Sequence, residues 1–542
     1  MNVAGWRLPV GGLAVAGLCI VFAFAGLMSH DPWKTADAVH LSIARGFAMP
    51  TANSAAGLLI PHMAGNAWLE TPPLYHWIAA LIGNVAAALA GPDFWISGAR
   101  STSALFSLGG LLGIHAAARG FHGREAGLVA PLLAMGTLGL FVPAHDAQPA
   151  TTAFAAVGAV LAGLAWWELR PRTSALALGG GIGIGMLGVG PGMAVATAIV
   201  VGLALCYPRW RRVSASSWIV VAGLSACLVA AWPVALHLVA PDAFETWWSI
   251  QSGPSERQMF DAKRMQILAW GTWPALPIAL WTIWLQRARL LSGRNAVPLA
   301  AVLASGAYFL LNDEPIEAIL PLIAALSVVG SAGAGKLRRG AANALDWFGT
   351  MTITMFMALV WIAAIAIQTG EPARIAKNFT KPAPGFVAEF AWPVMTIAIL
   401  VTLVWLTIVF AFPRSPWRAV ARWGIGITAT WVLVVALVLP WADYSKTYRP
   451  VSAQLKAALG TDPGCITSQS VGMGQLGAFD VLHGIQTTPR ASGSTCAWLL
   501  RQTMPGLSIP VPGWDVVTIA ARPGDRSEVY VLYRRTPYSK AR

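Results

Sequence analysis

The sequence predicts a polytopic α-helical membrane protein with about 13 transmembrane helices, juxtamembrane helices in its first outer loop, and a small C-terminal α/β domain outside the membrane. Three observations support this fold class. The 542 residues are 56% hydrophobic and only 11% charged, and their mean hydropathy of +0.61 lies far outside the range of soluble proteins. The apolar residues form long runs separated by short basic clusters. The segment from residue 442 onward lacks such runs.

Thirteen apolar runs are long enough to cross a bilayer as helices. They cover residues 6–28, 96–117, 124–142, 149–168, 174–190, 192–207, 215–239, 266–287, 296–311, 316–333, 346–367, 390–412 and 421–441. A fourteenth run, 74–89, is short and follows two prolines, so hydropathy alone does not decide whether it spans the membrane. The glycine-rich run from Gly179 to Gly190 indicates close helix packing, because it lacks the Lys-Ser/Thr of a phosphate-binding loop.

Basic clusters decide the orientation, since Lys and Arg collect in cytoplasmic loops. When 74–89 is placed along the surface, the main clusters fall on one side, and loop 29–95, the other outer loops and the tail fall on the opposite side. The net charge of +14 then reflects the membrane topology and does not indicate nucleic-acid binding. Attraction to anionic membrane lipids is a secondary implication of this charge. The clusters are Arg119/Arg124, Arg170/Arg172, Arg209/Arg211/Arg212, Arg287/Arg289/Arg294, Lys336/Arg338/Arg339 and Arg414/Arg418/Arg422.

The tail, 442–542, has the pattern of a small α/β domain. Its β-rich runs lie at 465–471, 514–520 and 528–534, and Pro-Gly turns separate them. The tail also contains Cys465 and Cys496, whose spacing matches no metal motif. On the extracytoplasmic side this pair is a candidate disulfide.

Residues suited to chemistry are concentrated in loop 29–95. Asp37 and His40 share one face of a helix predicted from Asp37 to Ala48, and a carboxylate with a neighbouring His can act as a general base toward a hydroxyl or amine. Glu70, followed by two prolines and an aromatic cluster, is costly at a membrane surface unless something binds there. The alternatives are a solvated amphipathic helix and an interfacial aromatic anchor with an incidental acid.

Two further outer loops carry candidates. In the run from Pro143 to Pro149, Asp146 either contacts loop 29–95 or caps the helix that starts near Pro149. In the third loop, 241–264, tryptophans are mixed with Arg257, Lys263 and Arg264, a composition that suits an anionic lipid headgroup. The alternative for this loop is an interfacial aromatic belt with some charge.

The order of these pieces resembles a known family. A first span and an acidic juxtamembrane helix are followed by the element Trp68-Leu69-Glu70-Thr71-Pro72-Pro73-Leu74-Tyr75-His76-Trp77, a span ending in the run from Arg119 to Arg124, and a short acidic outer loop. This order resembles the GT-C membrane glycosyltransferases, specifically the bacterial branch that includes aminoarabinose (lipid A) transferase and relatives of protein mannosyltransferases. The resemblance covers residues 1 to about 290. It implies a transmembrane domain, 1–441, and a periplasmic domain, 442–542.

The chain departs from the family pattern at three places. The Asp-Glu pair of the family's first loop corresponds to Ala36-Asp37, which leaves one acid. The Glu-Lys-Pro element reads Glu70-Thr71-Pro72, and the Thr-Lys-Gly-Pro element reads Gly188-Val189-Gly190-Pro191, so two Lys residues are missing. Loss of a phosphate-facing Lys removes a charge-assisted contact of roughly 2 kcal/mol.

The resemblance implies an inner-membrane glycosyltransferase that moves a sugar from a polyprenyl-phosphate donor to a periplasm-facing lipid A-like lipid, glycan or protein, with inversion by direct displacement. No cofactor is indicated, although the acids are compatible with a divalent metal ion. A non-catalytic relative that binds a lipid carrier or partner enzyme is one alternative, and a transporter is another, which the scarcity of charge within the spans disfavours. The expected roles are a general base for Asp37, orientation of substrate or metal for Glu70 and Asp146, substrate contacts for Lys34, His40, Tyr75 and His145, and donor-phosphate contacts for Arg257, Lys263 and Arg264.

Overall fold

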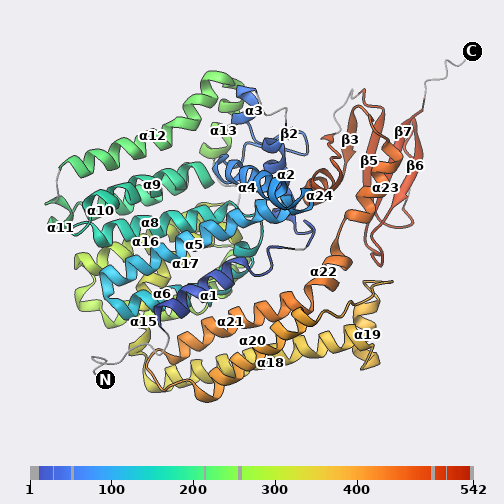
Figure 1. Cartoon of the computed structure of the whole chain (residues 1–542). Helices are drawn as coiled ribbons and strands as arrows, with labels where there is room; N and C mark the ends of the chain where they lie inside the picture. Colours follow the sequence, from blue (N-terminus) through green and yellow to red (C-terminus); the bar gives the residue numbers. More distant parts are fainter. Residues whose placement is uncertain are drawn as a thin grey trace, which may run out of the picture.

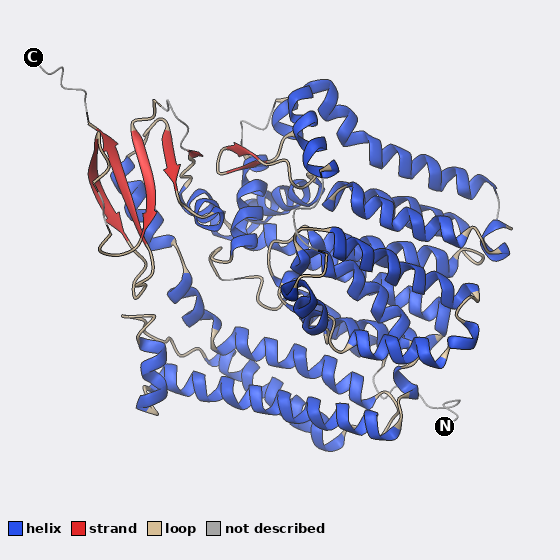
Figure 2. Cartoon of the chain, turned by 180° about the vertical axis from the view of Figure 1, so that it is seen from behind, coloured by secondary structure: helices blue, strands red, loops and turns tan. Residues whose placement is uncertain are grey.

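The computed structural model describes residues 11–28, 30–49, 54–212, 215–253, 259–489, 495–507 and 510–536. It shows a large helical body joined to a small domain of helices and strands at the C-terminal end (Figure 1). Seen from behind, all the longer strands belong to this small domain (Figure 2). The predicted class, a polytopic helical protein with a C-terminal α/β unit, is confirmed at this level.

Among the described residues, seven helices are long and apolar enough to cross a membrane. They are α5 with its preceding turn (Pro92–His122), α9 (Pro171–Val189), α12 (Ala215–Val239), α16 (Gly293–Leu311), α18 (Arg339–Thr369), α20 (Trp392–Ala411) and α21 (Arg418–Leu437). Two further pairs of consecutive helices are bent at a short break, and the number rises to nine if each pair is one span. The pairs are α6 (Arg124–Met135) with the turns over Leu138–His145, and α14 (Ala262–Gly271) with α15 (Ala275–Leu285).

Shorter apolar helices complete the helical body. They are α1 (Gly12–Phe24), α4 (Leu74–Ala90), α8 (Ala150–Trp166), α10 (Pro191–Ala204) and α17 (Pro315–Ser331). Each of the thirteen predicted runs overlaps one of these helices, but helix length and composition establish seven to nine spans. The predicted number of thirteen therefore stays a prediction.

Small residues allow the helices of the body to pack closely. α12, α9, α8 and α5 lie in successive layers (Figure 1). A Cβ on Gly113 of α5 would lie 2.5 Å from the backbone of Gly158 in α8, and a Cβ on Gly183 of α9 would lie 2.4 Å from Leu228 of α12. Such contacts are typical of helix association in a bilayer, where apolar burial alone gives little driving force. The glycine-rich run therefore serves helix packing, as predicted.

The first outer loop folds into short elements over the end of this body. They are α2 (Thr35–Ala48), α3 (Ala55–Leu59), and a two-stranded antiparallel ribbon of β1 (His62–Met63) and β2 (Asn66–Ala67), followed by α4. The helix predicted from Asp37 to Ala48 is thus confirmed and begins two residues earlier. Only part of α2 is apolar, and its central residues are nevertheless buried.

The small domain begins after α22 (Leu439–Lys446) and contains a five-stranded mixed sheet. The strand order is β4-β3-β5-β7-β6, with β3 parallel to both β4 and β5 and with β7 antiparallel to β5 and β6. The elements are α23 (Arg449–Leu459), β3 (Ile466–Gln469), α24 (Met473–His483), β4 (Thr488–Pro489), β5 (Trp498–Thr503), β6 (Trp514–Ala520) and β7 (Val529–Arg535). The three β-rich runs of the sequence correspond to β3, β6 and β7.

A disulfide joins Cys465 to Cys496, beside the paired strands β3 and β5, with the two Cα atoms 4.9 Å apart. We predict that the variant Cys465→Ser/Cys496→Ser lowers the free energy of unfolding of this domain by about 3 kcal/mol, because the crosslink closes a loop between residues 31 apart. Amide hydrogen exchange of β3 and β5 measures this change. The exposed Cys206→Ser change is the matched control. Equal exchange in the variant and the wild type would contradict the prediction.

Candidate functional site

A buried ion pair between Asp37 and Arg100 lies at the centre of the outer loops. Asp37 stands in the first turn of α2, and Arg100 projects from α5. The Nη2 and Nε atoms of Arg100 donate to the Asp37 carboxylate at 2.6 and 2.9 Å, and both side chains are at most 1% exposed. Burial alone would raise the pKa of Asp37, but the charge and hydrogen bonds of Arg100 outweigh it and hold this pKa below its ordinary value.

The second outer loop is attached to the same carboxylate. The backbone N–H of Ala147 donates to Oδ1 of Asp37 at 2.8 Å. Ser103 of α5 donates to the backbone carbonyl of Asp146 at 2.6 Å, and its hydroxyl lies 2.7 Å from that of Tyr75 in α4. Two outer loops and two helices therefore meet around Asp37.

Lys34 and Asp146 form a second, more accessible ion pair. The Nζ atom of Lys34 lies 2.7 Å from Oδ1 of Asp146, and the side chains are 30% and 6% exposed. The pKa of Asp146 is raised to about 6, because burial and the nearby charge of Asp37 outweigh the lowering effect of Lys34. The hypothesis that Asp146 contacts the first outer loop is thus confirmed. The capping alternative is wrong, since α8 has no side-chain cap at its start.

The two histidine candidates of the loops are buried and engaged within the protein. His40 Nδ1 lies 3.1 Å from Nε2 of His76, and burial lowers the pKa of His40 to about 4. No hydrogen bond joins His40 to Asp37 among the described side chains. His145 lies between the backbone carbonyls of Phe141 and Phe22, each 2.5 Å from a ring nitrogen. The His40 imidazole is therefore neutral at pH 7 and offers no positive charge to a phosphate.

Glu70 belongs to a second group, which Gln148 connects to the first. The carboxylate of Glu70 is exposed, and its pKa is raised by partial burial and by the neighbouring Glu314. Gln148 donates its backbone N–H to the Tyr75 hydroxyl at 3.1 Å and its side-chain amide to Glu317 of α17, also at 3.1 Å. The outer face near Glu70 is therefore acidic.

The three basic residues predicted to hold a donor phosphate have different positions. Arg257 lies outside the described residues, and Lys263 is exposed on α14. Arg264 is fully buried and donates to the carbonyls of Phe309, Leu310 and Asn312 at the end of α16. Through these contacts Arg264 caps the C-terminus of α16, and its predicted contact with a donor phosphate stays a prediction.

Sequence reasoning missed Arg100, Gln148 and Glu317. It placed nearly all charge in loops, whereas Arg100 stands inside the predicted span 96–117. A charged side chain in an apolar segment indicates a buried partner or a functional site. That signal points to Arg100 and, in the same way, to Glu317 at the start of the run 316–333. Among the residues that the structure describes, no group of three or more His, Cys, Asp or Glu side chains is placed to hold a metal ion.

An apolar groove ends near Glu70. It has a volume of about 820 Å³ and lies between α10 and α16, lined by exposed aliphatic residues that include Ile199 and Leu303. Its polar end is formed by Gln251 and Asn312, and the Gln251 side chain donates to the backbone carbonyl of Glu70 at 2.9 Å. α16 has 19 residues, so the groove follows about 28 Å of helix.

Two solved structures of ArnT from Cupriavidus metallidurans share this architecture. The structure bound to undecaprenyl phosphate superposes with a TM-score of 0.67 at 14% identity, covering 96% of this chain and 97% of that one. The apo structure gives a TM-score of 0.66 at 15% identity with the same coverage. The chain has the ArnT fold. No protein-family model matches the sequence, and no curated protein matches it. The predicted resemblance to the aminoarabinose transferase fold is confirmed by the ArnT superposition.

We predict that Arg100→Gln lowers the free energy of unfolding by about 3–5 kcal/mol, because it leaves the Asp37 carboxylate buried without its charge partner. Thermal unfolding of the purified chain in detergent measures the loss. The matched control is Arg172→Gln, an exposed position on α9. The double variant Asp37→Asn/Arg100→Gln should be more stable than the sum of the single changes, and additive effects would contradict a direct interaction.

Proposed function

We propose that this chain is an inner-membrane glycosyltransferase that moves a sugar from a polyprenyl-phosphate donor to a lipid A-like lipid, glycan or protein outside the cytoplasm. The main support for the proposal is that an apolar groove ends next to a loop that carries ordered carboxylates. The groove ends at Gln251, which contacts Glu70, and Glu70 lies in the same loop as Asp37 and Lys34. The apolar groove fits a long isoprenoid chain, and the carboxylates suit acid–base chemistry. The ArnT fold supports the same function.

The ionisation of the two aspartates divides their roles. Asp146 has a pKa of about 6, so it is ionised at pH 7 and close to the ideal basicity for a general base. Its Oδ1 accepts from Lys34, and within the described part of the chain its Oδ2 accepts no hydrogen bond. Asp37 has a lowered pKa, and both of its oxygens are held by Arg100 and Ala147. We therefore assign the base to Asp146 and a positioning role to Asp37, which differs from the role that the sequence predicts for Asp37.

The proposed step is a direct displacement at the anomeric carbon. The acceptor hydroxyl or amine loses its proton to Asp146 and forms a bond to the anomeric carbon, while the bond from that carbon to the phosphate oxygen breaks. The electron pair of that bond leaves with the polyprenyl phosphate, and the configuration inverts. Lys34, Lys263 and Arg257 are the proposed contacts of the donor phosphate. Lys34 is 30% exposed beside Asp146, Lys263 is exposed, and the sequence places Arg257 in the same outer loop as Lys263. Glu70 is left to orient the sugar hydroxyls.

The side of the membrane follows from charge and cysteine chemistry. The outer loops carry the acids, and the opposite loops carry the basic clusters that the positive-inside rule assigns to the cytoplasm. The disulfide between Cys465 and Cys496 suits an oxidising compartment. Both features support a periplasmic small domain in a bacterial inner membrane, which is part of the proposal.

Mass spectrometry of envelope lipids and glycans tests the proposed function. A strain that lacks the gene is complemented with the wild type, Asp146→Asn or Asp93→Asn, an exposed acid of the first outer loop. We expect a sugar-sized mass difference that the wild type and Asp93→Asn restore, whereas Asp146→Asn lowers the product at least about a hundredfold. No difference in any strain under several growth conditions would support the non-catalytic alternative, which the missing Lys at Thr71 and Val189 favours.

The transfer rate should depend on pH through Asp146. Because the carboxylate must be ionised to accept a proton, the rate in isolated membranes should rise as the pH passes about 6 and then level off. Lys34 lowers this pKa, so Lys34→Gln should move the rise to higher pH, while Asp93→Asn leaves it in place. A rate that is independent of pH between about pH 5 and 8 would exclude Asp146 as the base.

A further inference from the structure

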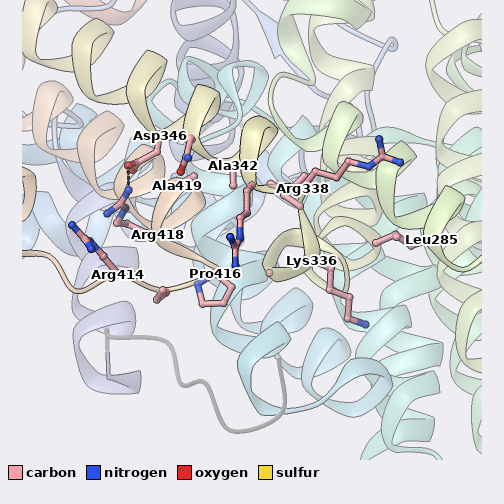
Figure 3. Close-up of a pocket in the computed structure, with 14 residues that line it drawn as sticks. Leu285, Lys336, Arg338, Ala342, Asp346, Arg414, Pro416, Arg418 and Ala419 are labelled. Atoms are coloured by element: carbon pink, nitrogen blue, oxygen red, sulfur yellow. Dashed lines mark ion pairs between the residues drawn. The ribbon is translucent and has the colours of Figure 1, made fainter. Parts of the chain in front are cut away.

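A pocket of about 920 Å³ lined by basic side chains lies on the side of the protein opposite the outer loops. It is formed by two connections far apart in the sequence. One joins α17 to α18 and contains η5 (Ala334–Lys336), and the other joins α20 to α21. Figure 3 shows Lys336, Arg338, Arg414 and Arg418 around this hollow, with Leu285 at one side.

The pocket has a large excess of positive charge. Five cationic side chains line it, namely Lys336, Arg338, Arg339, Arg414 and Arg418, together with a single carboxylate, Asp346. Asp346 is already paired with Arg418 at 2.7 Å and with the buried Arg422 at 3.1 Å. Among the described residues, no ion pair joins Lys336, Arg339 or Arg414 to an acid. The pocket thus presents cations that the protein itself does not neutralise.

Specific contacts fix the connection that contains η5 against the other connection and against α15. A Cβ on Gly335 would lie 2.5 Å from the indole nitrogen of Trp417, so only glycine permits this approach. Trp281 donates its indole N–H to the carbonyl of Lys336 at 3.2 Å, and the Arg338 guanidinium lies 5.6 Å from the Trp281 ring. The positive-inside rule explains why basic residues occur on this face. It does not explain why they surround a hollow held together by tryptophan contacts.

Apolar surface continues from the pocket along the membrane-facing side of α18. Asn343 lines the pocket, and one turn further Trp347 and Phe348 are 67% and 45% exposed. Leu285, at the other wall, is 40% exposed. A ligand with an anionic head and an apolar tail matches both the basic pocket and the apolar surface along α18, whereas a soluble phosphate matches only the basic pocket.

We infer that this pocket binds the phosphate headgroup of an anionic phospholipid from the cytoplasmic leaflet, with its acyl chains along α18. Guanidinium groups bind phosphate oxygens through paired N–H donors, and Lys336 adds a point charge. The inference is independent of the proposed transferase reaction, because it concerns the opposite face and no residue of the outer loops. Its failure would leave that reaction untouched.

Native mass spectrometry of the full chain in a neutral detergent tests the inference, with phosphatidylglycerol, cardiolipin or phosphatidylethanolamine added in steps. We expect retained phosphatidylglycerol or cardiolipin and little phosphatidylethanolamine. The variant Lys336→Gln/Arg339→Gln/Arg414→Gln should bind the anionic lipids at least about tenfold more weakly. It leaves Asp346 and its two arginines in place, so the pocket walls are expected to keep their fold.

The matched control removes the same charge from the same face. Arg172, Arg211 and Arg212 are exposed and line no part of this pocket, so their joint change to Gln should alter lipid retention less than twofold. Equal weakening in both triple variants would overturn the inference, since diffuse surface charge would then suffice. Binding of inorganic pyrophosphate without retention of either anionic lipid would overturn the assignment to a lipid headgroup.

Discussion

The outer architecture depends on one buried ion pair, that between Asp37 and Arg100. Taking a carboxylate and a guanidinium out of water costs several kcal/mol per ion, and this cost is offset only when both groups are fully hydrogen-bonded. Arg100 meets the condition by donating to Asp37 and to the backbone carbonyl of His30, and Asp37 meets it by also accepting from Ala147. The pair therefore fixes α2, α5 and the second outer loop in one arrangement, and Asp146 takes its position from its neighbour Ala147.

The helical body was predictable because its signal is local. Every apolar run in the sequence overlaps a helix, and α2 begins within two residues of its predicted start, since hydropathy and helical periodicity are properties of neighbouring residues. Arg100 was not predicted, because its partner is 63 residues away and only the folded chain shows that the two meet. The capping contacts of Arg264 were not predictable for the same reason, because the carbonyls that it binds belong to the C-terminus of α16, 45 residues further along the chain.

The small domain packs against α2, the helix that carries Asp37, and stabilises its position. Asp480 of α24 accepts hydrogen bonds from Ser42 and Arg45 of α2 at 2.6 and 2.5 Å. A Cβ on Gly477 would lie 2.6 Å from the carbonyl of Ala38, so α24 lies directly against α2. Asp31, just before α2, is bound by Arg449 and Thr447. Because α2 carries Asp37 and begins next to Lys34, any movement of the small domain changes the geometry of both ion pairs.

Lys34 links substrate binding to basicity in the proposed reaction. The ammonium group holds the pKa of Asp146 below the value that burial and Asp37 would give it. A donor phosphate is a stronger competitor for this ammonium than a single carboxylate, since it carries more charge and more acceptor oxygens. When the phosphate draws Lys34 away, the pKa of Asp146 should rise, because the carboxylate loses the charge and the hydrogen bond of the Lys34 ammonium and keeps only the charge of Arg100 to oppose burial and Asp37. The carboxylate then becomes the stronger base only after the donor has arrived, so the same side chain that binds the phosphate also prepares the acceptor for attack.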